Sequence, residues 1–278
     1  MKALVYDDVE KLVYRYMADP VPAAGQSLIR IEASGICGSD MHAYLGHDER
    51  RPAPVILGHE AAGTVEGGAL DGKRVTINPL TTCGLCKACK AGRDNLCPDR
   101  MIISMPPREG AFGELVVMAD RNLVEVPDGV PLVKAALAEP LACGWHAVRL
   151  GAETLDMPIA QARCVVIGGG AIGVGAALCL RAVGATDIHV IEPNAVRRAS
   201  LNAIDGFTAV APGAVTAADL VIDGVGYATT RADATAITRP GGVIMHIGLG
   251  ESTGGLDIRR MTLQEITFIG TYTYTAQD

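Results

Sequence analysis

Four cysteines in one glycine-containing loop are the residues of this sequence best suited to bind a metal ion. They are Cys83, Cys86, Cys89 and Cys97, at spacings of three, three and eight residues. Zinc has no directional preference from its d electrons and binds four thiolates tetrahedrally at about 2.3 Å, so one flexible loop can supply every ligand. The pattern predicts a structural zinc site that has no open coordination position.

A disulfide framework is the alternative interpretation of these cysteines. The segment from Met1 to Asp8 contains neither an apolar signal-peptide core nor a small-residue cleavage site. We therefore expect a cytoplasmic protein, and in that reducing compartment closely spaced cysteines are more often metal ligands than disulfides. The other four cysteines lack such spacing: Cys37, Cys143, Cys164 and Cys179.

A glycine-rich turn is the second motif with chemical meaning. The segment Gly168-Gly169-Gly170-Ala171-Ile172-Gly173 matches G-x-G-x-x-G, follows an aliphatic run and is followed by Glu192, 24 residues after Gly168. In such a turn the first glycine allows a tight bend, the second admits a pyrophosphate and the third lets helix and strand pack closely. The acidic residue would bind ribose hydroxyls and repel a 2′-phosphate, so the predicted cofactor is NAD. A structural turn beside a surface glutamate is the alternative.

Length, composition and charge narrow the class of protein. The 278 residues suffice for two domains with separate cores, and 33 glycines with 49% hydrophobic but only 4% aromatic residues are typical of an α/β enzyme. The net charge of −7 argues against nucleic acid as a partner, because a zinc module that binds nucleic acid would carry a basic face. The most apolar run, residues 164–180, is too short and glycine-rich to span a membrane.

The pattern of apolar residues predicts a β-rich domain followed by an alternating one. Short alternating runs separated by Gly, Pro and Asp indicate strands in a small distorted barrel, at residues 3–6, 27–33, 63–66, 74–77, 113–118 and 123–126. Residues 132–150 have the apolar spacing of a helix that links two domains. Beyond residue 162, strands at 164–167, 187–191, 220–223 and 242–247 and a helix at 171–183 indicate a doubly wound parallel sheet. We expect domains at residues 1–145 and 146–278.

Together these motifs resemble the zinc-dependent medium-chain alcohol and polyol dehydrogenases, and the likeness is to the sorbitol dehydrogenase branch. Three further motifs carry the resemblance: Cys37-Gly38-Ser39-Asp40-Met41-His42, Gly58-His59-Glu60 and Ala138-Glu139-Pro140-Leu141. The resemblance covers essentially the whole chain and implies a GroES-like catalytic domain followed by a Rossmann domain that binds NAD. Members of the family continue beyond the position of Asp278, so we expect the chain to end before their usual C-terminal segment.

The resemblance also implies a second, catalytic zinc site. Its ligands would be Cys37 and His59, and the third ligand, which varies between branches of the family, would be Glu60 or Glu139. One thiolate, one imidazole and one carboxylate leave the fourth position for water or an alcohol oxygen. Zinc in this site would stabilise an alkoxide whose carbon can release hydride to the nicotinamide.

Two residues near Cys37 match the proton relay of the family. Ser39 would take the alcohol proton and pass it to His42, and an imidazole is suited to this step because its ordinary pKa lies near neutrality. A solvated histidine in a turn is the alternative interpretation of His42.

Further residues are candidate contacts of the cofactor. Arg197, five residues after Glu192, matches a basic residue that contacts the adenosine ribose or phosphate in the family, although it also fits a solvated helix face. Ile172 lies in the glycine turn, and Ile247 and Leu249 follow a late strand, where the nicotinamide half would lie.

The predicted function is oxidation of a secondary alcohol or polyol, with one catalytic and one structural zinc ion and with NAD as hydride acceptor. A threonine or other amino-alcohol dehydrogenase would use the same ligands. From another class, a non-catalytic nucleotide-sensing protein related to quinone reductases would keep the fold. A strand at residues 266–272 is expected at a sheet edge, which favours a homodimer or homotetramer, and no membrane partner is expected.

Overall fold

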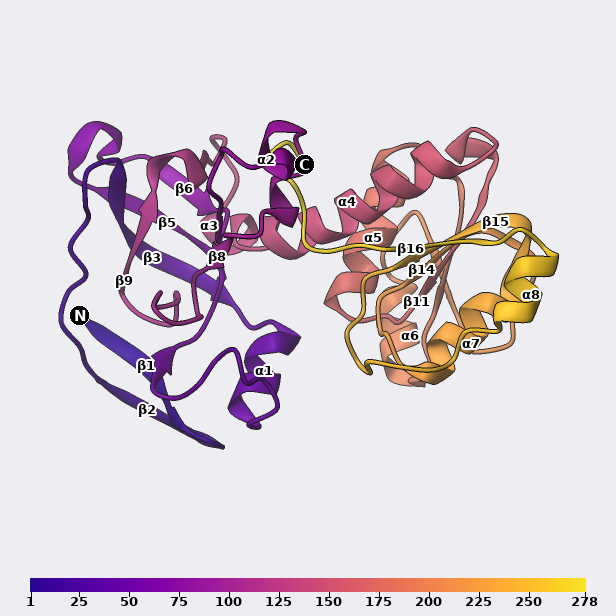
Figure 1. Ribbon diagram of the computed structural model, residues 1–278, viewed down its shortest axis with the longest axis horizontal. Helices are drawn as coiled ribbons and strands as arrows, with labels where there is room; N and C mark the ends of the chain where they lie inside the picture. Colours follow the sequence, from indigo (N-terminus) through magenta and orange to yellow (C-terminus); the bar gives the residue numbers. More distant parts are fainter. The chain divides into compact units, whose positions relative to one another are not determined.

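The computed structural model describes residues 1–278, and the chain forms two compact units (Figure 1). The first unit contains Met1–Glu139 together with Thr275–Gln277, and the second contains Pro140–Tyr274 together with Asp278. The division therefore falls after residue 139, inside helix α4 (Ala138–Thr154), whereas the sequence led us to expect it after residue 145.

Antiparallel sheets form most of the first unit. A five-stranded sheet has the order β10-β6-β5-β3-β9, and a three-stranded sheet has the order β2-β1-β4. The strands of the larger sheet are β3 (Gln26–Gly35), β5 (Glu60–Glu66), β6 (Arg74–Ile77), β9 (Leu115–Ala119) and β10 (Leu123–Glu125). Those of the smaller sheet are β1 (Lys2–Asp8), β2 (Lys11–Tyr16) and β4 (Val55–Ile56).

Six of these eight strands coincide with segments expected from the sequence, and β4 and β2 do not. Strand β4 has only two residues, too few to show an alternating pattern. Strand β2 is longer. Its outward positions carry Leu12, Tyr14 and Tyr16, which are all exposed. Because these outward residues are as apolar as the inward ones, β2 lacks the polar alternation by which a half-buried strand is recognised.

Short helices and a small hairpin complete the first unit. The helices are α1 (Gly38–Tyr44), α2 (Lys87–Lys90) and α3 (Leu132–Ala135), and the hairpin pairs β7 (Leu80–Thr81) with β8 (Met101–Ile102). The single helix expected over residues 132–150 is in fact two, α3 and α4. Pro140 explains the interruption, because it has no N–H to donate to the carbonyl of Ala136.

The second unit is a six-stranded parallel sheet with helices between its strands. The sheet has the order β13-β12-β11-β14-β15-β16, so counting its strands along the chain gives 3-2-1-4-5-6. The strands are β11 (Arg163–Ile167), β12 (Asp187–Ile191), β13 (Thr208–Val210), β14 (Ala218–Asp223), β15 (Thr238–His246) and β16 (Thr267–Gly270). The helices after α4 are α5 (Ala171–Ala182), α6 (Ala195–Leu201), α7 (Ala228–Ile237) and α8 (Ile258–Leu263).

Apolar residues cover both faces of this sheet. Cys164 and Val166 of β11 lie in one buried cluster, and Val165 and Ile167 lie in another. Burial on both faces explains why the strand is an unbroken aliphatic run. The strand order reverses at β11, and in open parallel sheets ligands bind beside the carboxyl ends of the strands at such a point. No helix in the structure has both the length and the hydropathy needed to cross a membrane.

Candidate metal centres and cofactor site

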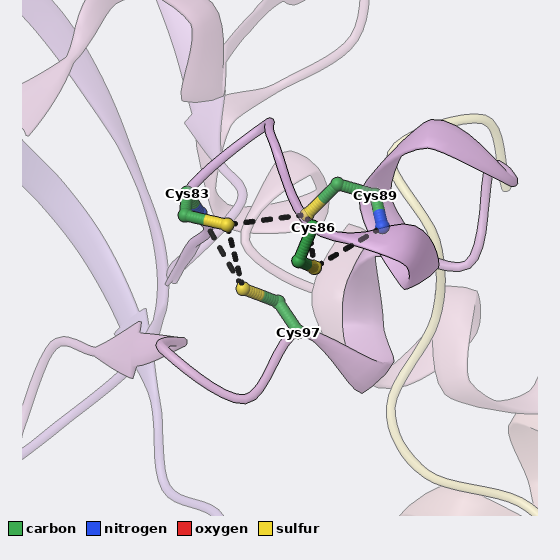
Figure 2. A group of neighbouring side chains, drawn as sticks. All are labelled: Cys83, Cys86, Cys89 and Cys97. Carbon is green, nitrogen blue, oxygen red and sulfur yellow. Dashed lines mark hydrogen bonds between the residues drawn. The ribbon is translucent and has the colours of Figure 1, made fainter.

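The four loop cysteines point toward one another (Figure 2). The Sγ atoms of Cys83 and Cys97 are 3.5 Å apart, as are those of Cys86 and Cys89, and the Sγ atoms of Cys83 and Cys89 are 4.0 Å apart. In a tetrahedron of sulfurs at 2.3 Å from zinc, neighbouring sulfurs are separated by about 3.8 Å. All four thiols are free, so the geometry fits one zinc ion.

Backbone groups hold this loop in shape. The Cys83 N–H donates to Cys97 Sγ at 3.4 Å, and the Cys89 N–H donates to Cys86 Sγ at 3.5 Å. Backbone N–H groups of Leu85 and Cys86 lower the pKa of Cys83 to about 7, whereas burial and the neighbouring Cys86 thiol raise the pKa of Cys89 to about 11. Four thiolates at neutral pH therefore require a bound cation to compensate their charge.

A second, different group of ligand atoms lies near the start of β5. The ligand atoms of Cys37, His59 and Glu60 all lie within 4.8 Å of one another, and His59 and Glu60 are only 4% and 6% exposed. Cys37 caps helix α1, while Gly35 pairs with Glu60 across strands β3 and β5. A Cβ atom on Gly35 would overlap the Glu60 carboxylate, so this glycine leaves the space that Glu60 occupies.

Asp40 contacts the residues of this ligand group. It accepts hydrogen bonds from the N–H groups of Cys37 at 3.0 Å and Gly58 at 3.2 Å, and its Oδ1 lies 3.6 Å from His59 Nδ1. Its burial opposes ionisation, but these contacts lower its pKa. With Nδ1 turned toward Asp40, the Nε2 atom of His59 remains available for a metal.

The electrostatics of this group favour a cation. Burial alone would lower the pKa of His59, but hydrogen bonds with Asp40 and Cys37 and the charges of Asp40 and Glu139 raise it to about 10. Burial and the charge of Asp40 raise the pKa of Glu60. Negative groups thus gather around His59, and one thiolate, one imidazole and one carboxylate suit zinc with a position left open.

The remaining predicted residues of this site lie on helices α1 and α4. Glu139 is buried in the first turn of α4 and acts on His59 through its charge, but the compact ligand group includes Glu60 in its place. Ser39 and His42 are three residues apart on α1, where Ser39 is half-buried and His42 is exposed. The rings of His42 and His47 are 6.5 Å apart.

Sequence reasoning missed two kinds of supporting residue here. Asp40 lies within the motif from Cys37 to His42, and its position three residues after the helix cap Cys37 is a recognisable capping signal. Ser104 and Arg51 are both almost fully buried, and the Ser104 side chain contacts both Arg51 and His59. No spacing in the sequence points to either residue.

In the second unit the glycine turn leaves an open space at the N-terminus of α5. Gly168 has φ of +99°, and a Cβ atom on Gly173 would overlap the carbonyl oxygen of Gly168. By contrast, no atom lies within 4 Å of the point where a Cβ of Gly170 would be. The first N–H groups of a helix have no intrahelical partners, so this space fits a phosphate group.

Glu192 lies beside this turn at the end of β12 and is 2% exposed. Its carboxylate accepts hydrogen bonds from the N–H groups of Gly169 at 3.0 Å and Asn194 at 2.8 Å, and from Arg197 Nη1 at 3.0 Å. Burial opposes ionisation, but these bonds lower the pKa of Glu192. A fixed negative charge at this point would accept hydrogen bonds from ribose hydroxyls and repel a phosphate.

The other predicted cofactor residues follow the glycine turn and β15. Ile172 is half-buried in the first turn of α5, Ile247 is half-buried directly after β15, and Leu249 is 77% exposed.

Asp223, at the carboxyl end of β14, is a further residue that sequence reasoning missed. It is fully buried and accepts hydrogen bonds from the N–H groups of Val225 and Gly226, both at 3.0 Å. Its other oxygen lies 3.1 Å from His246 Nδ1, and Thr230 donates to it at 3.0 Å. These contacts fix the loop after β14 where Val225 packs against Gly168.

Comparison with known proteins agrees with this geometry. The family model of the alcohol dehydrogenase GroES-like domain matches residues 23–128, and that of the zinc-binding dehydrogenases matches residues 171–278. The chain is 30% identical over 296 aligned positions to L-galactonate-5-dehydrogenase of Escherichia coli K12, an alignment that covers 100% of the chain and 85% of that protein. It is 35% identical to sorbitol dehydrogenase of Bacillus subtilis over 206 positions, which cover 71% of the chain and 57% of that protein.

A solved structure gives the same picture. The crystal structure of a protein described as a zinc-binding dehydrogenase from Sinorhizobium meliloti 1021, bound to NADP, superposes with a TM-score of 0.88 at 29% identity and covers 99% of this chain and 84% of that one. These matches confirm the predicted fold class, a GroES-like domain joined to a Rossmann-type parallel sheet. With relatives this similar along its whole length, the chain belongs to the zinc-binding dehydrogenase family of medium-chain alcohol and polyol dehydrogenases.

Proposed function

We propose that the protein is a zinc- and NAD-dependent dehydrogenase that oxidises a secondary alcohol or polyol. The observation that carries the proposal is the buried group of Cys37, His59 and Glu60, which provides three ligands of the kind that leave a catalytic zinc one open position. In this proposal the first unit is the catalytic domain and the second unit is the NAD-binding domain.

The residues of the first unit have different roles in this proposal. Cys37, His59 and Glu60 hold the catalytic zinc, which when bound acts as a Lewis acid on the substrate oxygen. Asp40 orients His59, and Glu139 adds negative charge close to the site. We assign Glu60 as the third ligand because it shares the compact group, and Glu139 is the alternative. The four loop cysteines hold the structural zinc.

In this proposal, residues of helix α1 transfer the proton of the substrate hydroxyl to solvent. Ser39 and His42 are three residues apart, which brings them to the same face of a helix. Ser39 takes the proton of the substrate hydroxyl, and His42, which is exposed, releases it to solvent. Replacing His42 with Gln should slow turnover, whereas His47→Gln, a control at another exposed histidine of the same segment, should not.

The cofactor is NAD in this proposal because Glu192 is held in its ionised form beside the turn that receives the pyrophosphate. Gly168, Gly170, Ile172 and Gly173 shape that turn. Arg197 neutralises part of the Glu192 charge, and Ile247 and Leu249 contact the nicotinamide half. The similar protein from Sinorhizobium meliloti is bound to NADP, and the Glu192 carboxylate predicts the opposite preference for this chain.

The experiment that tests the proposal is reduction of NAD and of NADP, followed at 340 nm, with a panel of substrates. The panel contains sorbitol, xylitol, galactitol, L-galactonate, threonine and simple secondary alcohols, each with and without a zinc chelator. We expect chelator-sensitive reduction of NAD by a polyhydroxylated substrate. Turnover of threonine alone would favour the amino-alcohol alternative, and preference for NADP would contradict the role given to Glu192.

The variant Cys37→Ser separates the metal from the cofactor. It should contain one zinc ion per chain where the wild type contains two, should lose turnover and should bind NAD as the wild type does. A wild type that binds NAD but contains only the zinc of the cysteine loop would instead favour a nucleotide-sensing protein.

Assembly and location are also part of the proposal. Strand β16 is the edge of the parallel sheet, and an edge strand can pair with the same strand of a second copy. We propose a homodimer or homotetramer, measurable by light scattering. Eight free cysteines suit a reducing compartment, and we place the protein in the cytoplasm.

A further inference from the structure

Ser104, which follows strand β8, has an unusual backbone conformation for its residue type. Its φ is +70°, in the left-handed region that favours glycine, and its side chain is fully buried. A residue with a Cβ is strained in this region, and such strain persists where the surrounding structure holds the residue in place. The conformation therefore directs attention to what the Ser104 side chain does.

The Ser104 hydroxyl lies between two side chains that come from elsewhere in the sequence. Its Oγ is 3.5 Å from His59 Nδ1 and 3.4 Å from Arg51 Nε. A guanidinium can only donate, so Ser104 Oγ is the acceptor of the bond from Arg51. A hydroxyl oxygen has two lone pairs, and the second can accept from the Nδ1–H of His59.

Two acceptors thus face the same imidazole nitrogen. Asp40 Oδ1 lies 3.6 Å from His59 Nδ1, almost the same distance as Ser104 Oγ. Asp40 is a charged carboxylate acceptor, whereas Ser104 is a neutral acceptor that also receives a hydrogen bond from the cation Arg51. How the Nδ1–H is shared between them sets how strongly His59 donates to a metal at Nε2.

Arg51 is held firmly enough for this role. It is 2% exposed, and its guanidinium forms an ion pair with Asp48, whose side chain is 8% exposed. Asp48 also pairs with the exposed Arg50 at 2.8 Å. The cation is therefore anchored through Nη1, and its Nε–H donates to the Ser104 hydroxyl.

We infer that Ser104 is a positioning residue for His59 and that it links buried Arg51 to the catalytic metal group. The inference rests on the proposed function, because it concerns the zinc that His59 would hold. A serine at φ +70° is retained, in this view, because glycine would relieve the backbone but remove the hydroxyl that orients the imidazole.

Two variants separate the hydroxyl from the backbone strain. Ser104→Ala removes the oxygen and keeps the strain, whereas Ser104→Gly removes both. We expect both variants to bind cobalt(II) at the catalytic group about 10- to 100-fold more weakly than the wild type, as is usual when an outer partner of a metal-bound histidine is lost. The visible absorption bands of the bound cobalt should shift, and zinc in the cysteine loop should stay in place.

Thermal unfolding gives the second measurement, on proteins that carry zinc in the cysteine loop and no metal at the catalytic group. Ser104→Gly should unfold at a higher temperature than Ser104→Ala, because glycine is not strained at this φ. A residue with only a structural role would instead show weaker metal binding in proportion to its loss of stability. Ser27→Ala is the matched control, since Ser27 is a buried serine of the same unit whose hydroxyl donates to Asp120 at 2.7 Å.

The outcomes are distinct. Weaker cobalt binding and shifted bands in both Ser104 variants, with wild-type behaviour of Ser27→Ala, would support the inference. A cobalt affinity within twofold of the wild-type value and unshifted absorption bands in both Ser104 variants would overturn the inference. An effect of Ser27→Ala equal to that of the Ser104 variants would also overturn it. A wild-type protein that binds metal only at the cysteine loop would refute the proposed function itself, before any variant is compared.

Discussion

Two glycines of one turn, only three residues apart, should respond in opposite ways to the same substitution. Gly170→Ala should preserve stability and abolish tight cofactor binding, whereas Gly173→Ala should mainly destabilise the fold. The structure gives the reason, because a Cβ at Gly170 meets no atom within 4 Å, whereas a Cβ at Gly173 overlaps the carbonyl oxygen of Gly168.

The free energies can be worked out for each variant. Gly170 has φ of −82° and ψ of −174°, which any residue adopts, so alanine gains about 0.4–1 kcal/mol from the unfolded chain. As a helix cap, alanine is less favourable than glycine by about 0.5 kcal/mol, so the net change is near zero. At Gly173, overpacking against backbone costs about 3 kcal/mol, and the better helix propensity of alanine offsets about 1 kcal/mol. The remaining loss of about 2 kcal/mol predicts a fall in Tm of about 4–8 °C.

Calorimetry and NADH fluorescence measure the two effects separately. The added methyl group of Gly170→Ala would fill the space proposed for the pyrophosphate, so NAD affinity should fall at least about tenfold, equivalent to about 1.4 kcal/mol. Wild-type NAD affinity in this variant would refute the assignment of the pyrophosphate to the open space. An unchanged Tm in Gly173→Ala would show that helix and turn are less tightly packed than the structure indicates.

Two further predictions concern a metal site and a buried carboxylate. Cys86→Ser should lose the zinc of the cysteine loop and unfold at a lower temperature, because a closed zinc site contributes directly to folding stability. Metal analysis and calorimetry test this prediction. A variant that retains two zinc ions and the wild-type Tm would contradict it. Burial opposes the ionisation of Asp223, but hydrogen bonds from His246 and from backbone N–H groups lower its pKa. Its contribution to stability is therefore complete above the unfolded pKa of about 3.9 and is lost as the pH falls through the folded pKa. The difference in Tm between wild type and Asp223→Asn should therefore be constant from pH 7 down to about pH 5 and shrink below pH 4; a difference that grows with acidity would reverse the sign of this reasoning.

The local motifs were the part of the site that the sequence could predict. The outermost loop cysteines, Cys83 and Cys97, are 14 positions apart, and the glycine turn joins a strand to the helix that directly follows it. In each case the chemistry depends on neighbours in the chain, so spacing is sufficient. Glu192, at the end of the next strand, could also be predicted, because parallel strands bring their carboxyl ends to the same edge of a sheet.

The surroundings of His59 could not be predicted in the same way. Ser104 contacts a histidine 45 positions earlier and an arginine 53 positions earlier, across segments that contain no repeated pattern. The compact grouping of Glu60 with Cys37 and His59 likewise depends on the β3–β5 register and on a missing Cβ at Gly35. Such contacts follow from tertiary packing, which spacing along the chain does not encode.

This difference has a consequence for how relatives of one fold can differ in chemistry. In the proposed function, Cys37 and His59 are ligands that determine whether a catalytic metal is bound. Asp40 and Ser104 both face Nδ1 of His59 and are not members of the ligand group, so in this proposal a substitution at either position would change the donor strength of His59 and leave the ligand set intact. Buried Arg51 extends this influence outward to the loop that carries Asp48. In this proposal the reactivity of the metal group would be tuned partly through Ser104 and Arg51, whose positions no ligand motif predicts.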